Sequence, residues 1–167
     1  RCEGVVAIVN VGYDLASSAR AVEMARWEPD CYAAVGIHPH DATDVDEAAL
    51  ARLGEWLTEP GVVAVGETGL DYYWHKDAPE WQRARFRTHI RAARRCAKPL
   101  IIHTRDSAAD TLRLMQEEGA GEAGGVMHCF TETLQVAKGA LDLGFYISFS
   151  GIVTFKNGQI IQETARV

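Results

Sequence analysis

The chain has 167 residues and a formal net charge of −6, with 47% hydrophobic and 24% charged residues. This length suits one domain with a substantial core, and the composition is that of an ordinary globular protein. No apolar run approaches the ~20 residues that a membrane-spanning helix needs. The acidic balance argues against a protein that grips duplex DNA through a broad basic face, but it allows an enzyme that meets phosphate through metal ions.

The four cysteines are scattered and form no Cys-x-x-Cys pair: Cys2, Cys31, Cys96 and Cys129. Such a pattern indicates buried free thiols and a reducing, cytoplasmic location. The first residues also lack the layout of a signal peptide.

Short apolar runs alternate with amphipathic stretches along the first half of the chain. Residues 4–11 are rich in valine, which predicts a strand. A helix capped by Ser17 or Ser18 follows to about residue 27, and residues 32–37 form the next strand. A helix capped by Asp44 or Asp46 runs to about residue 59, and the third strand is expected at 62–67.

The alternation continues through the second half. We expect a helix from about 79 or 80 to 96 and a strand at 99–103, then a helix at 107–118 and a strand at 126–129. A helix at 133–143, a strand at 144–148 and the first turns of another helix from 157 complete the chain. Residues 119–124 match Gly-x-Gly-x-x-Gly, but they follow a helix and precede a strand, the reverse of a dinucleotide-binding loop, so they predict a turn.

This order predicts an α/β fold with parallel strands joined by crossover helices. A doubly wound sheet binds its ligand at one crevice, whereas a (β/α)8 barrel gathers residues from many strands on one rim. Four successive strand ends carry ligand-type residues, namely His38, Glu67, His103 and His128. We therefore favour a single barrel domain over residues 1–167. It is expected to be incomplete, with about one unit absent before its first residue and about two after its last, because eight units take ~250 residues.

Three of these residues follow buried apolar runs where a strand gives way to a loop: Glu67, His103 and His128. Carboxylate oxygen and neutral imidazole nitrogen are the ligands of metals that activate water. A single buried histidine is more often a hydrogen-bonded core residue. Three ligand-type residues at matched strand ends favour a divalent metal site.

The sequence His38-Pro39-His40 follows the second strand. Proline cannot donate to a strand ladder, so the pair does not lie on a central strand. We expect His38 to face a substrate and His40 to be a loop or capping residue.

Aromatic residues follow Asp71 at positions 72–74, and a basic residue, Arg105, follows His103. Exposed aromatic rings beside a phosphate-processing site can stack on bases, or they can pin down their own loop. Arg105 can fork onto a phosphate or hold Asp106 or Glu67 in place.

Five stretches together resemble the TatD-type metal-dependent hydrolases, deoxyribonuclease-like members of the amidohydrolase superfamily: GIHPHD (36–41), VGETGLDYY (65–73), PLIIHTRD (99–106), GGVMHCFTE (124–132) and LGFYISFSGIVTFK (143–156). The resemblance implies a barrel with a centre of divalent metal ions (Mg, Mn or Zn, two per complete site), in which Glu67, His103 and His128 are ligands. The family's first-strand His-x-His pair and late-strand Asp have no counterpart, since Ala165 follows Glu163-Thr164 where that Asp would stand.

The activity that this resemblance implies is cleavage of DNA phosphodiester bonds by metal-activated water, at a single-strand end. We expect catalytic roles for His38, Asp71 and Arg105, single-stranded DNA as the partner and no membrane association. The sequence leaves the oligomeric state open and favours a monomer for the full-length protein. Two alternatives stay open: a hydrolase of small esters, lactones or amides, and an inactive partial barrel that serves as an interaction module.

Overall fold

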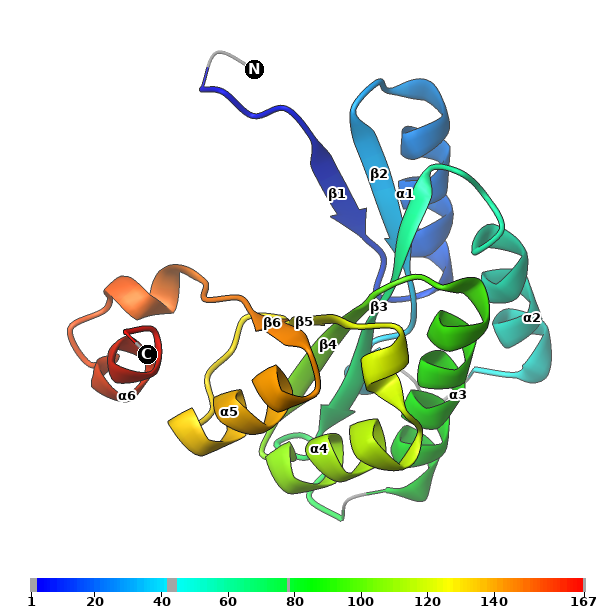
Figure 1. Cartoon of the computed structure of the whole chain (residues 1–167). Helices are drawn as coiled ribbons and strands as arrows, with labels where there is room; N and C mark the ends of the chain where they lie inside the picture. Colours follow the sequence, from blue (N-terminus) through cyan, green and yellow to red (C-terminus); the bar gives the residue numbers. More distant parts are fainter. Residues whose placement is uncertain (1–2, 42–44, 78, 167) are drawn as a thin grey trace.

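The computed structural model describes residues 3–41, 45–77 and 79–166 (Figure 1). Six strands form one sheet in sequential order: β1 (Ile8–Val11), β2 (Cys31–Val35), β3 (Val62–Asp71), β4 (Leu100–Arg105), β5 (Gly125–Met127) and β6 (Phe145–Ile147). Every neighbouring pair is parallel. A doubly wound sheet reverses its order at a switch point, so this sequential order excludes that alternative and confirms the predicted (β/α)8 barrel arrangement, of which the described residues form six strands.

The described helices are α1 (Leu15–Trp27), α2 (Glu47–Trp56), α3 (Glu80–Cys96), α4 (Ala108–Glu117), α5 (Leu134–Asp142) and α6 (Gln159–Thr164), with short 3₁₀ turns η1 (Pro39–Asp41), η2 (Ala120–Glu122) and η3 (Gly151–Thr154). Helices α1 to α5 connect the strands and lie along one face of the sheet, and α6 follows β6 and packs beside α5 (Figure 1). The expected turn at 119–124 thus contains η2. Among the described helices, none is long and apolar enough to cross a membrane. Because each crossover returns to the start of the next strand, the carboxyl ends of all strands lie at one rim.

Helix α1 begins earlier than the sequence predicted. Asp14, not Ser17 or Ser18, is the N-cap: its carboxylate accepts a hydrogen bond from the Ser17 N–H, and the Ser17 hydroxyl bonds back to the Asp14 backbone. This reciprocal pair is a capping box, in which Ser17 occupies the third helical position. Asp46 caps α2 as predicted, and Asp44 lies outside the described residues.

Strand β3 is longer than predicted. It does not end at Glu67 but continues to Asp71. Its pairing with β4 shifts register between Val65 and Thr68 and then resumes as far as Asp71 and Arg105. Glu67 therefore lies inside an irregular stretch of strand, with its side chain half-buried at the rim.

The core fills the space between the sheet and the helices, and its largest fully buried side chains include Phe86, Phe130 and Phe145. The expectation of buried thiols is wrong for the cysteines that are described. Cys31, Cys96 and Cys129 are free, but the first two are only half-buried and the third is exposed. Cys2 lies outside the described residues.

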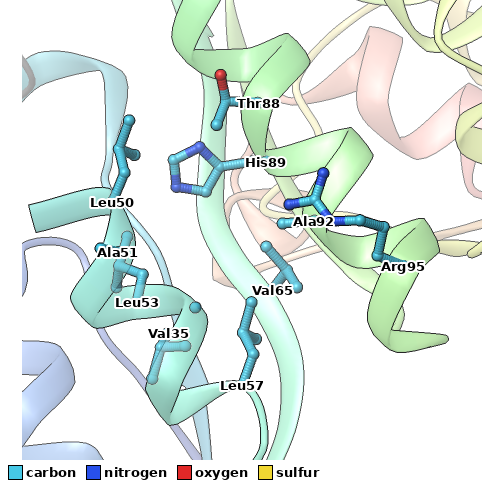
Figure 2. A pocket seen from close by; sticks show the side chains of 11 residues that line it. Val35, Leu50, Ala51, Leu53, Leu57, Val65, Thr88, His89, Ala92 and Arg95 are labelled. Carbon is cyan, nitrogen blue, oxygen red and sulfur yellow. The ribbon is translucent and has the colours of Figure 1, made fainter. Parts of the chain in front are cut away.

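A cavity of about 250 Å³ lies between α2 and α3. Figure 2 shows Leu50 and Leu53 from α2 on one side and His89 from α3 on the other, and Val35 and Val65 of the sheet also line the cavity. The cavity is on the helix side of the sheet, and none of the predicted site residues lines it. The predicted chemistry therefore belongs to the strand-end rim, not to this cavity.

Candidate metal centre

Three side chains converge at the rim. Ligand atoms of His38, Glu67 and His103 all lie within 4.8 Å of one another. The Glu67 Oε1 atom is 3.5 Å from His103 Nδ1 and 4.0 Å from His38 Nε2. Their side chains are only 18–20% exposed. The structure thus brings together two of the three predicted ligands, Glu67 and His103, and adds the residue predicted to face substrate, His38.

Asp71 fixes the orientation of His103 from behind. The Asp71 side chain is 3% exposed, and its Oδ2 atom lies 2.9 Å from His103 Nε2. Since a carboxylate only accepts, Nε2 carries a proton; in the neutral ring the Nδ1 lone pair then faces Glu67, whereas in the doubly protonated ring Nδ1–H donates to Glu67. A carboxylate on the far nitrogen of a histidine is typical of metal-ligating imidazoles. The donor set therefore fits a divalent cation held between Glu67 and His103.

The electrostatics favour an anionic Glu67. Burial alone would raise the pKa of Glu67, but the hydrogen bond to His103 and the electrostatic interaction with the nearby His38 ring lower it below its ordinary value. Burial would likewise lower the pKa of His103, whereas its hydrogen bonds to Glu67 and Asp71 raise it. The site therefore holds negative charge that either a proton on His103 or a cation can balance.

His38 has its ring held by the backbone. Its Nδ1 atom accepts a hydrogen bond of 3.1 Å from the N–H of His40. A neutral imidazole has one acceptor nitrogen, so the proton sits on Nε2, the nitrogen that faces Glu67. In this arrangement His38 is a hydrogen-bond donor, which favours its predicted role at substrate over a ligand role.

His128 lies directly after β5. Its backbone N–H donates to the Ile102 carbonyl at 2.8 Å, which places it beside β4. The ring nitrogen Nε2 lies 3.3 Å from Cys129 Sγ, outside the cluster of three. The charge of His128 still contributes to the lowered pKa of Glu67. Its role as a ligand stays a prediction.

The family follows from comparison with known proteins. The model of the TatD related DNase family matches residues 1–167. The chain belongs to the TatD family. It is 43% identical over 166 residues to the uncharacterized metal-dependent hydrolase YabD of Bacillus subtilis, covering 99% of this chain and 65% of that protein.

Two further TatD relatives extend the comparison. The 3'-5' ssDNA/RNA exonuclease TatD of Edwardsiella piscicida is 37% identical over 152 residues, or 90% of this chain and 58% of that one. The crystal structure of YJJV, a TatD homolog from Escherichia coli, superimposes with a TM-score of 0.89 at 27% identity, covering 96% of this chain and 62% of its own. The chain thus spans less than two thirds of the length of these relatives.

Arg105, at the end of β4 in this TatD chain, adopts a position that the sequence did not indicate. Its guanidinium lies over the ring of Tyr73, 3.7 Å from the centroid. Both side chains are exposed at the rim. Stacking occupies a face of the guanidinium and leaves its N–H edges for hydrogen bonding.

Helix α3 supplies two buried polar residues that the sequence analysis missed. Gln82 accepts a hydrogen bond from the Asp71 N–H (3.0 Å) and donates to the carbonyls of Asp71 (3.1 Å) and Pro39 (3.2 Å). His89, seven residues on, accepts from the Ile37 N–H at 3.2 Å. These bonds join α3 to Ile37 and Pro39, on either side of His38, and to Asp71, which bonds His103. The available signal was a glutamine and a histidine beside the apolar stripe of α3, where a polar residue needs a partner.

Proposed function

We propose that the protein is a metal-dependent phosphodiesterase that hydrolyses single-stranded DNA from a strand end. The observation that carries the proposal is the line of groups from Asp71 through His103 to Glu67, which presents a nitrogen lone pair and a carboxylate to one point. The names of the relatives support it, since one is a metal-dependent hydrolase and another a 3'-5' ssDNA/RNA exonuclease. DNA as the substrate is consistent with a cytoplasmic location.

Each residue has a distinct task in this proposal. Glu67 and His103 would hold the cation, with His128 joining them from the end of β5. A bound divalent cation activates water and neutralises charge on phosphate oxygens. Asp71 keeps the proton of His103 on Nε2 and so keeps Nδ1 available. This is a positioning role, because its other carboxylate oxygen already accepts from two backbone N–H groups.

Two residues would meet the phosphate. The His38 Nε2–H faces the space beside Glu67, where it can donate a hydrogen bond to a phosphate oxygen. Arg105 presents its N–H edges at the same rim while its face rests on Tyr73. Donors of this kind stabilise the charge that develops on a phosphate in the transition state.

The test measures metal binding and cleavage separately. Titration calorimetry with Mn²⁺ is expected to show binding that Glu67→Gln and His103→Asn weaken at least tenfold. With Mn²⁺ or Mg²⁺, end-labelled single-stranded DNA should be shortened stepwise by the parent protein and not by these variants. Glu23→Gln, the same chemical change on the exposed face of α1, is the matched control and should behave like the parent.

Three results would contradict the proposal. Retained cleavage in Glu67→Gln would remove this residue from the site. Hydrolysis of p-nitrophenyl esters without any cleavage of DNA would favour the alternative of a small-ester hydrolase. Absence of Mn²⁺ binding in the parent protein would favour an interaction module.

A further inference from the structure

A continuous series of rings runs outward from the metal cluster. The centroids of His103 and His38 are 4.3 Å apart, and those of His38 and His40 are 6.5 Å apart. His40 is stacked on Trp74, with centroids at 5.6 Å and an interplanar angle of 13°. Trp74 in turn meets Tyr73 edge to face at 5.0 Å. We call these five residues the ring track; it starts at His103 in the proposed cation site and ends at the exposed ring of Tyr73.

The outer rings of the track are not buried. Trp74 is 58% exposed and Tyr73 is 42% exposed, and His40 is exposed as well. Single exposed rings are common on protein surfaces, but Trp74 contacts both of the other two rings, so the three form one exposed aromatic surface. Large exposed rings that contact one another beside a group of polar side chains are candidates for contact with a planar ligand.

The turn that carries these rings has another anchor. The Asp71 Oδ1 atom accepts hydrogen bonds from the backbone N–H groups of Tyr73 (3.1 Å) and Trp74 (3.3 Å). Asp71 also bonds His103 through its second oxygen. The backbone of the turn is therefore held by Asp71, the same residue that orients His103. Because these backbone hydrogen bonds already anchor the turn, the Trp74 ring is not needed to hold it in place and is available for a ligand.

We propose that Trp74, His40 and Tyr73 form a stacking site for the bases of single-stranded DNA, next to the phosphate bound at the His103 end of the track. This inference rests on the proposed function and adds the part of the substrate that the outer rings recognise. Stacking accepts any base because every base has a π-face. With a net charge of −6, the chain has no general attraction for a phosphate backbone, so the rings supply affinity that charge does not.

The experiment measures binding without cleavage. Fluorescence anisotropy in EDTA follows a labelled 12-nucleotide oligothymidylate and, separately, an abasic strand of the same length and charge. Trp74→Ala is expected to weaken binding of oligothymidylate about tenfold and to leave binding of the abasic strand unchanged. Trp74→Phe, which keeps a ring, should restore most of the affinity. Trp27→Ala is the matched control, because Trp27 is 77% exposed at the far end of α1.

Salt dependence separates stacking from charge. Trp74→Ala should shift log K by the same amount at every salt concentration, whereas Arg105→Gln should reduce the slope of log K against log salt by about one. Equal affinity of parent and Trp74→Ala for oligothymidylate would overturn the stacking site, and so would equal affinity of the parent for both strands. DNA cleavage by the parent with either of these results would leave the proposed function intact. Base-dependent binding through Trp74 without cleavage would support the stacking site and count against the nuclease.

Discussion

Replacement of Gln82 by Met tests whether α3 holds the two sides of the site together. The change keeps the length and approximate volume of the side chain but removes three hydrogen bonds, to the Asp71 N–H, the Asp71 carbonyl and the Pro39 carbonyl. Gln82 is 1% exposed, so water does not replace them. Leaving a buried polar group unpaired costs ~1–3 kcal/mol. The unpaired Asp71 N–H should cost the full amount, and each of the two carbonyls should cost a part of it. We therefore expect the free energy of unfolding to fall by about 3–5 kcal/mol.

Urea denaturation measures this loss directly. A decrease in the midpoint at constant m-value would report stability alone. Gln135→Met, the same change at an exposed position of α5, should alter the free energy of unfolding by less than ~0.5 kcal/mol. If Gln82→Met unfolds at the same urea concentration as the parent, the three bonds do not stabilise the rim and the reasoning is refuted.

Mn²⁺ binding by the folded molecules of the Gln82→Met variant tests whether Gln82 also positions the candidate ligands. Asp71 bonds His103 and Pro39 follows His38. Loosening both should weaken Mn²⁺ binding severalfold, since misplaced ligands lose affinity. An unchanged Mn²⁺ affinity would show that Gln82 supports the fold and not the cluster.

Three further predictions concern stability. In thermal unfolding, Gly69→Ala should lower stability by more than ~3 kcal/mol, because a Cβ there would lie 1.9 Å from the His103 carbonyl oxygen. Gly54→Ala in α2, where a Cβ would have no atom within 4 Å, should raise stability by ~1 kcal/mol. Equal effects of the two changes would contradict the close approach at Gly69. Burial lowers the pKa of His89 from 6.5 to about 4, so the unfolded state binds the proton more readily, and stability should be full above pH 6.5 and decline by about 3 kcal/mol as the pH falls to 4. His89→Gln should flatten that part of the pH profile, and an unchanged profile would exclude His89 as its source. Lys98→Met should lower the free energy of unfolding by about 2 kcal/mol, because the Lys98 ammonium donates to the backbone carbonyls of Leu57, Glu59 and Val62. A variant that unfolds at the same temperature as the parent would refute this prediction.

The order of strands and helices was accessible from the sequence alone. Apolar runs, Pro-Gly stops and capping residues are local signals, and they placed β2, β4 and α3 close to their observed bounds. The types of residue at strand ends also indicated a barrel rim with Glu67 and His103 together. Helix and strand signals depend on neighbours in the chain, and the strand-end residue types become a shared rim through the general geometry of parallel crossovers, so the sequence was enough for both.

Only the tertiary structure decided how the rim is built. Glu67 lies within β3 because the pairing with β4 shifts register between Val65 and Thr68, and register depends on the partner strand. Asp71 points inward to His103 for the same reason. The His38 ring lies beside Glu67 and His103 because side-chain direction after a strand end depends on loop geometry.

The support from α3 and the ring track are likewise tertiary features. Gln82 is separated from Pro39 by 43 positions, and His89 from Ile37 by 52. Trp74 meets His40 only because two strand ends share one rim. Local periodicity carries no information about such contacts. They arise when parallel crossovers bring the carboxyl ends of separate strands to one edge, where side chains distant in sequence complete one another's hydrogen bonds.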